Sequence, residues 1–374
     1  MARIHFIYFD AGGGHRSASR ALREVIERQG RPWDVRLVNL QDLLEPIDVF
    51  RKATGLRLED LYNLLLEKGW TFGTAQMAAG MQAVIRLFHR RQVRMLRAFW
   101  ERERPGMVVS VIPHFNRAIF ESLSGGVPFV TILTDIADWP PHFWIERQPQ
   151  YLICGSDRAF GQARAMGHDP SRVFRASGMV LSPRFYDEVD KPAEKLPGFD
   201  PALPTGLIMF GGQGAAVMYD IVRRLEDRAV QIIALCGRNR KVAERLRALP
   251  PRAPRMHVEE FTTEVPRFMR AADFLIGKPG PGTISEAFAM RLPVIIECNA
   301  WTLPQERYNT EWVREEGLGI VVRSFRQVGE AVDELLRPGN FRRFKANVAA
   351  RRNRAVFEIP DILATILESW QKPH

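Results

Sequence analysis

Short apolar runs alternate with longer amphipathic segments along most of the chain. The clearest runs are rich in Val and Ile and lie at residues 4–9, 35–38, 107–111, 128–133, 152–154, 207–210, 230–235, 274–276 and 294–296. Runs this short and continuous are typical of parallel strands that are buried on both faces. The segments between them, such as 17–29, 218–226 and 283–290, have the spacing of helices. The alternation predicts an α/β fold with doubly wound parallel sheets.

This alternation is interrupted between residues 183 and 204. Five prolines stand in that stretch with charged residues between them, which is typical of a linker. A chain of 374 residues is also too long for one ordinary core. We therefore expect two Rossmann-like domains at 1–185 and 205–354, joined by a linker at 186–204. We further expect a C-terminal helix at 355–374 that packs back on the first domain.

A glycine triplet follows the first predicted strand and precedes a predicted helix. In Gly12-Gly13-Gly14-His15 the glycines allow positive φ and let a ligand approach the backbone closely. The free N–H groups at a helix start bind anions or polar oxygens. His15 would lie at the carboxyl end of a strand, where open α/β sheets bind ligands. The alternative is a tight strand-to-helix turn that binds nothing.

Two further glycine-rich turns follow predicted strands in the second half of the chain. The first is Phe210-Gly211-Gly212-Gln213-Gly214, and the second is Gly277-Lys278-Pro279-Gly280-Pro281-Gly282-Thr283. The second turn matches neither a Walker loop nor a dinucleotide fingerprint. It would still suit a diphosphate at a helix N-terminus, and Glu286 would accept hydrogen bonds from a ribose diol. The alternative for Glu286 is a capping box in which Thr283 is the helix N-cap.

The segment from Lys278 to Ala287 closely resembles the donor-site signature of monogalactosyldiacylglycerol synthases and bacterial diacylglycerol glucosyltransferases, which are MurG-like glycosyltransferases. The resemblance extends in order over most of residues 3–325. Its other segments are Gly12 to Ser19, Met107 to Pro113, Thr134-Asp135 with Trp139-Pro140 and Trp144, Cys236 to Asn239, Phe261-Thr262, and Gln305-Glu306 with Asn309. The chain departs from the family at Pro279, where Ala is usual, and at Leu303-Pro304, which replaces Pro-Gly. Plant members carry a His before Pro113, whereas here Ile112 precedes the proline and His114 follows it.

The resemblance implies a GT-B fold, in which two Rossmann-like doubly wound domains face each other across a cleft. It also implies an inverting, single-displacement reaction with a UDP-sugar as donor. Carried over by position, the turn Gly280–Thr283 (Gly280, Pro281, Gly282 and Thr283) would hold the diphosphate and Glu286 the ribose. The backbone of Phe261 and Thr262 would contact the uracil, and Gln305 and Glu306 the sugar hydroxyls. We add Gly13, Gly14, Gly212, Arg238 and Lys278 to the predicted donor-binding residues.

Sugar transfer also requires a base for the acceptor hydroxyl. His15 is the first candidate, because an imidazole titrates near working pH and deprotonates a hydroxyl well when it is positioned. Asp135, which follows the run at 128–133, is the second candidate. Its alternatives are to orient His15 or to cap the following helix. The sequence contains no D-x-D motif, and we expect neither a metal nor an organic cofactor.

The chain is basic, with 53 Lys and Arg against 43 Asp and Glu and a net charge of +10. Residues 84–104 combine apolar residues at helical spacing with several arginines. Such a helix either lies on anionic lipid or packs beside the strand at 107–111 with its arginines in water. We find no transmembrane stretch, signal peptide or nucleic-acid motif. We expect a cytoplasmic protein, peripheral on the inner face of the plasma membrane, with no nucleic-acid partner.

The favoured hypothesis is transfer of galactose or glucose from UDP-galactose or UDP-glucose to diacylglycerol or a related lipid. One alternative is a UDP-sugar enzyme of the same fold, such as a UDP-N-acetylglucosamine 2-epimerase, which needs no acceptor. Another is MurG-like transfer to a different lipid-linked acceptor. The third is a non-catalytic protein that binds nucleotide-sugars or lipid surfaces.

Overall fold

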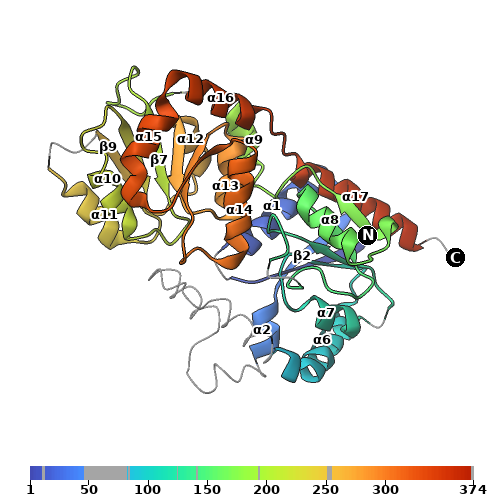
Figure 1. Cartoon of the computed structure of the whole chain (residues 1–374). Coiled ribbons are helices and arrows are strands. Elements are labelled where there is room, and N and C mark those ends of the chain that lie inside the picture. The colour runs from blue at the N-terminus through green and yellow to red at the C-terminus, as the bar shows by residue number, and fades with distance from the viewer. Residues whose placement is uncertain are drawn as a thin grey trace. The chain divides into compact units, whose positions relative to one another are not determined.

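A computed structural model describes residues 1–10, 13–45, 82, 85–123, 125–139, 142–192, 194–250 and 255–371 (Figure 1). The described residues divide into two units. The first contains those up to Pro183 and those from Asn353 onward, and the second contains those from Arg184 to Arg352. Gly12, Val84 and Pro140, which belong to motifs named above, lie outside the described residues.

The first unit is built on a six-stranded parallel sheet with the strand order β2-β1-β3-β4-β5-β6. Its strands are β1 (Ala2–Tyr8), β2 (Trp33–Asn39), β3 (Met107–Ser110), β4 (Phe129–Ile132), β5 (Tyr151–Cys154) and β6 (Val173–Arg175). Its helices are α1 (Gly14–Arg28), α2 (Leu40–Leu44), α6 (His89–Glu103), α7 (Asn116–Ser122), α8 (Asp157–Ala165) and α17 (Ala355–Gln371), with the 3-10 turn η2 (Pro170–Arg172). The central strands β3 and β4 are buried along their whole length, as helices on both faces of a parallel sheet require.

The last helix of the chain returns to the first unit. Helix α17 packs against α1, and Figure 1 shows it in red beside the blue α1. The segment before it is hydrogen-bonded to the loop after β6, where the Asn353 side chain donates to the Met179 carbonyl at 2.9 Å. At the same place the Arg354 N–H donates to the Ser177 hydroxyl at 2.7 Å. These contacts attach residues beyond the second unit to the first.

The second unit contains another six-stranded parallel sheet, with the strand order β12-β11-β10-β7-β8-β9. Its strands are β7 (Thr205–Met209), β8 (Gln231–Leu235), β9 (Met256–Glu259), β10 (Phe274–Gly277), β11 (Val294–Glu297) and β12 (Gly319–Val322). Its helices are α9 (Arg184–Val189), α10 (Val217–Arg223), α11 (Arg240–Arg247), α12 (Val265–Arg270), α13 (Pro281–Ala289), α14 (Pro304–Glu315), α15 (Val328–Leu336) and α16 (Pro338–Ala349), with the 3-10 turn η3 (Phe325–Gln327).

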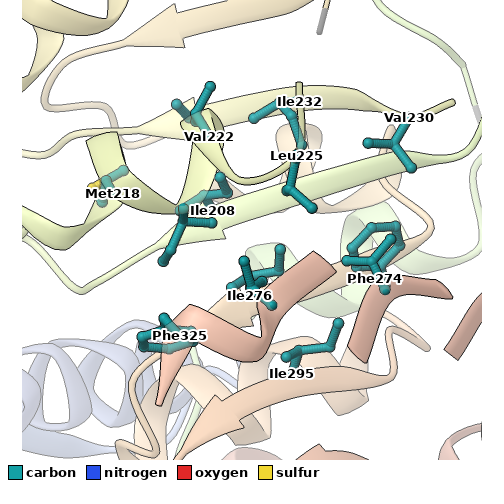
Figure 2. Packing of buried hydrophobic residues seen from close by; sticks show 14 of the residues in the cluster. Ile208, Met218, Val222, Leu225, Val230, Ile232, Phe274, Ile276, Ile295 and Phe325 are labelled. Carbon is teal, nitrogen blue, oxygen red and sulfur yellow. The ribbon is translucent and has the colours of Figure 1, made fainter. Parts of the chain in front are cut away.

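The core of the second unit explains why the sequences of its strands are continuous apolar runs. Ile208, Ile232 and Ile276 come from three neighbouring strands and are fully buried. Figure 2 shows them packed together with Phe274 and with Leu225, which follows α10. Burying a side chain of this size contributes about 1.5–3 kcal/mol relative to leaving it exposed, so this cluster fixes the sheet and the positions of the loops at its edge.

The predicted fold class is confirmed, since both sheets are parallel and strands alternate with helices. Strands β6, β9 and β12 are missing from the clearest apolar runs of the sequence. Each lies at the end of its sheet, and each contains partly exposed residues. The predicted linker starts within α9, the first helix of the second unit.

Candidate active site

His15 lies at the carboxyl edge of the first unit's sheet, next to the loop that follows β1. Helix α1 begins at Gly14, with Gly13 as its N-cap at a φ of 80°. This left-handed conformation favours glycine, because a Cβ would strain it. The imidazole of His15 is thus placed on the first turn of the helix, among its free backbone N–H groups.

The His15 ring is held by residues that follow two other strands. Its Nδ1 lies 3.2 Å from the Thr134 hydroxyl oxygen, just after β4. The ring also forms a hydrogen bond with the backbone of Val111, just after β3. Burial among these loops lowers the pKa of His15 to about 4, so the imidazole is neutral at ordinary pH. A neutral imidazole has the lone pair that a general base requires.

Asp135, the second candidate base, is tied to an indole beside His15. Its carboxylate accepts a hydrogen bond of 2.8 Å from the indole N–H of Trp144. The Trp144 ring lies 5.9 Å from the His15 ring, measured between centroids. Asp135 is therefore connected to His15 through Trp144, and this contact is compatible with an orienting role.

Asp138 organises the loop that carries Trp144. Its carboxylate accepts backbone hydrogen bonds of 3.0–3.1 Å from four consecutive residues, 142–145. The first of these donors, the N–H of His142, comes directly after residues 140 and 141, which lie outside the described part of the chain. The sequence marked Thr134 and Trp144 only as parts of a matched segment and assigned Asp138 no role. No local motif marks their contacts, because these form only when loops after different strands meet.

In the second unit, the turn after β10 is braced by helix α14. The ammonium of Lys278 lies 3.2 Å from the Glu306 carboxylate, which is largely buried. The side chain of Asn309, one turn further along α14, donates to the Pro279 carbonyl at 2.8 Å. A Cβ at Gly280 would approach both Lys278 and the Glu306 carboxylate within 3.5 Å. Lys278 and Glu306, both predicted donor-site residues, are thus in direct contact, and Gly280, a third, lies beside them.

The capping-box alternative for Glu286 is wrong. Helix α13 starts at Pro281, its N-cap is Gly280, and no side chain caps it. Proline is favoured at the first helical position because it has no N–H to satisfy there, so Thr283 falls inside the first turn. Burial raises the pKa of Glu286 to about 7. Within the described chain, this carboxylate has no hydrogen-bond or ion-pair partner, so it is available to a ligand.

Two more turns at this edge are in direct backbone contact. The Arg238 N–H donates to the Gly212 carbonyl at 2.9 Å. Gly237 has a φ of 58°, and a Cβ there would collide with the same carbonyl. The Arg238 guanidinium lies over the Phe261 ring, 5.2 Å from its centroid, and that ring is 56% exposed. An exposed cation therefore lies beside an exposed aromatic ring, near the turn after β7.

The other predicted donor-site residues are placed as follows. Thr262 accepts a hydrogen bond from the Glu264 N–H at 3.0 Å, in the turn between β9 and α12. Gln305 is partly exposed in the first turn of α14, next to Glu306. Gly282 is exposed on α13, whereas Gly13 and Gly14 belong to the first unit together with His15 and Asp135. The described residues contain no cluster of three His, Cys, Asp or Glu side chains that could hold a metal ion.

Helix α6 uses its apolar face for packing. Leu96 and Trp100 are buried in one cluster with Val108 of β3, and the Trp100 indole donates to the Ser122 hydroxyl at 2.8 Å. The arginines on the other face are exposed; they are Arg90, Arg91, Arg94 and Arg97. No helix in the described part is both long and apolar enough to cross a membrane.

A family model described as the glycosyltransferase family 28 C-terminal domain matches residues 207–365. The chloroplastic monogalactosyldiacylglycerol synthase of Spinacia oleracea is 27% identical over 90% of this chain and 66% of its own length. Monogalactosyldiacylglycerol synthase 1 of Arabidopsis thaliana is also 27% identical, over 90% of this chain and 65% of its own. The chain thus spans about two thirds of the length of these plant relatives.

Solved structures resemble the chain over nearly its whole length. MurG of Acinetobacter baumannii is 12% identical, with a TM-score of 0.60 over 98% of this chain and 100% of its own. The calicheamicin glycosyltransferase CalG4 is 18% identical, with a TM-score of 0.60 over 99% and 98%. These similarities establish the GT-B fold. The chain is therefore similar to the monogalactosyldiacylglycerol synthases over 90% of its length, and its residues 207–365 match the glycosyltransferase family 28 C-terminal domain.

Proposed function

We propose that this chain is an inverting glycosyltransferase that moves galactose or glucose from a UDP-sugar to diacylglycerol or a related lipid. The observation that carries the proposal is the position of the His15 imidazole, held beside Thr134 at the carboxyl edge of the first sheet. The activity named for the plant relatives, monogalactosyldiacylglycerol synthase, supports the lipid acceptor and the hexose class.

His15 acts in this proposal as the general base. In this role the ring proton would reside on Nδ1, beside the Thr134 hydroxyl oxygen, and Nε2 would carry the lone pair that takes the acceptor proton. As the acceptor oxygen attacks the anomeric carbon, its proton passes to Nε2 and the bond from that carbon to the UDP oxygen breaks. Attack from the face opposite the leaving group inverts the configuration in one step.

The second unit would bind and stabilise the departing UDP. The N–H groups at the start of α13, together with the Lys278 ammonium, suit the charge that develops on the diphosphate. Glu286, on the same helix, has no partner for its carboxylate among the described residues and would accept hydrogen bonds from both ribose hydroxyls. Gln305 and Glu306, on the first turn of α14, would contact the hexose.

We also propose a cytoplasmic location on the inner face of the plasma membrane. The exposed arginines of α6 and the net charge of +10 support attraction to anionic lipid. Since the apolar face of α6 is buried, the contact would be electrostatic, and binding to anionic vesicles should weaken as ionic strength rises.

The test uses diacylglycerol vesicles and labelled UDP-galactose, UDP-glucose and UDP-N-acetylglucosamine in separate reactions. We expect a labelled glycolipid from one of the first two donors and none without diacylglycerol. The absence of labelled glycolipid with all three donors, or sugar conversion that needs no acceptor, would contradict the proposal. The second result would favour an epimerase, because UDP-N-acetylglucosamine 2-epimerases share this fold.

A further inference from the structure

A second histidine, His114, lies at the same edge as His15. It follows β3 and has a φ of 73°. A side chain other than glycine costs roughly 1–2 kcal/mol in this left-handed region, and such strain persists only where the surroundings hold it. Here the His114 N–H donates to the Phe143 carbonyl at 2.7 Å, and the two rings lie 4.1 Å apart between centroids.

One short loop holds both imidazoles. Phe143 contacts His114, and the next residue, Trp144, contacts His15. Asp138 fixes that loop through its four backbone hydrogen bonds. Strands β1 and β3, which precede the two histidines, are neighbours in the sheet. Burial, and then the repulsion from His15, lower the pKa of His114 to about 4, so both rings are neutral at ordinary pH.

The two neutral rings present opposite groups. The Nδ1 of His114 is buried and has no partner among the described residues. A buried N–H without a partner is rarer and costlier than a buried lone pair, so the ring proton resides on Nε2. The His114 ring is partly exposed, and this edge presents a donor. As the general base of the proposed function, His15 would present an acceptor at Nε2, with its ring proton on the Nδ1 that lies beside the Thr134 hydroxyl.

We propose that His114 binds the lipid acceptor by donating a hydrogen bond from Nε2 to one of its ester carbonyls, which holds the neighbouring free hydroxyl against His15. This inference rests on the proposed function. A diacylglycerol has ester carbonyls that only accept hydrogen bonds and one hydroxyl that must lose its proton. A donor beside a base matches both groups, and it predicts that the protein distinguishes ester-linked from ether-linked acceptors.

The test compares diacylglycerol with a dialkylglycerol of the same chain length, which keeps the hydroxyl and lacks the carbonyls. Wild type should have a KM about tenfold lower for the ester lipid, as expected for one hydrogen bond at a desolvated site. His114→Asn tolerates positive φ but is too short to place a donor at the Nε2 position. It should raise the KM for the ester lipid about tenfold and leave that for the ether lipid unchanged.

His114→Gln reaches the Nε2 position and should restore part of the ester preference. The matched control is His142→Asn, since His142 is exposed in the same loop and has a φ of 69°. That control should leave both KM values and the melting temperature unchanged. Affinity for the UDP-sugar should be the same in all variants, because the change is confined to the acceptor.

Equal KM values for the two lipids in wild type would overturn the inference. So would an Asn variant that raises both values equally, since a structural defect does not distinguish an ester from an ether. If a folded wild type glycosylates neither lipid with any hexose donor, the proposed function fails and the inference fails with it. That outcome can be distinguished from the other two, in which the enzyme is active and only its acceptor preference differs from the one predicted here.

Discussion

At the carboxyl ends of their strands, the two sheets carry different kinds of loop. In the second unit the loops approach each other through backbone, and a Cβ at Gly237 or Gly214 would collide with a neighbouring carbonyl. In the first unit the loops meet through side chains, with His15, Thr134 and Trp144 in contact. Backbone that lies open to a ligand suits a diphosphate, whereas oriented neutral side chains suit the movement of a proton.

The comparison shows that the two edges tolerate change differently. Removing a side-chain functional group from the first edge should lower turnover and leave stability largely intact. Adding a side chain to the second edge should lower stability or donor binding. The predictions below use this contrast, from the largest expected effect to the smallest.

His15→Ala should have the largest effect on turnover. Loss of a positioned general base typically costs 10²–10⁴-fold in rate. We expect kcat to fall by roughly that factor while UDP-sugar affinity, measured by calorimetry, remains within about twofold of wild type. Turnover that survives the substitution would remove His15 from the reaction and with it the role assigned to the first edge.

Gly237→Ala should destabilise the second unit. Its φ of 58° disfavours a Cβ, and the added atom meets the Gly212 carbonyl. We expect a loss of about 2 kcal/mol or more in the free energy of unfolding, measured by urea denaturation. Gly212→Ala is the matched control, because a Cβ at Gly212 has open space. Equal stability of the two variants would show that the turns are not packed as described.

Donor binding should depend on the ionisation of Glu286. Burial raises the pKa of Glu286 to about 7, and the ribose diol requires the ionised carboxylate as acceptor. Affinity for a UDP-hexose should therefore be full above pH 8 and fall as the pH drops through 7. Linkage gives about a tenfold loss between pH 8 and 6. Glu286→Gln should bind more weakly with a flat profile, and a flat wild-type profile would contradict the role.

Thr134→Val should have the smallest effect. It removes the hydroxyl beside the His15 Nδ1 and keeps the side-chain volume. We expect kcat to fall about fivefold, the equivalent of one hydrogen bond near 1 kcal/mol. Thr131→Val is the control, since its hydroxyl bonds Gln150 within the core. That change should lower the melting temperature and spare turnover at saturating substrates; the opposite pattern would show that Thr134 does not orient His15.

The difference between the edges also explains what the sequence could predict. Strands β3, β7 and β10 are short and buried along their whole length, so each forms a continuous apolar run that can be recognised in the sequence. The glycine-rich turns could be predicted because the backbone conformation of each turn itself requires glycine. The edge strand β9 is partly exposed throughout and left no such run. The alternative in which Thr283 is the N-cap is wrong because Pro281 begins the helix earlier.

The contacts around His15 could not be predicted in the same way. Thr134 and Trp144 lie far from His15 in the sequence and reach its ring only because the segment after β4 folds beside the start of α1. Asp138 contributes by holding the backbone of Trp144. His114 was noticed only as a departure from a family pattern. Its positive φ, and an Nδ1 that has no partner in the described part of the chain, are properties of the folded protein that no residue spacing predicts.

The central claim is a single displacement in which His15 activates a lipid hydroxyl. Its most direct test is the anomeric configuration of the product, determined by proton NMR of the glycolipid formed from an α-linked UDP-hexose and diacylglycerol. We predict a β-linked hexose on the free hydroxyl of the lipid. An α-linked product, or the absence of any glycolipid under conditions in which the protein binds the UDP-hexose, would contradict the account.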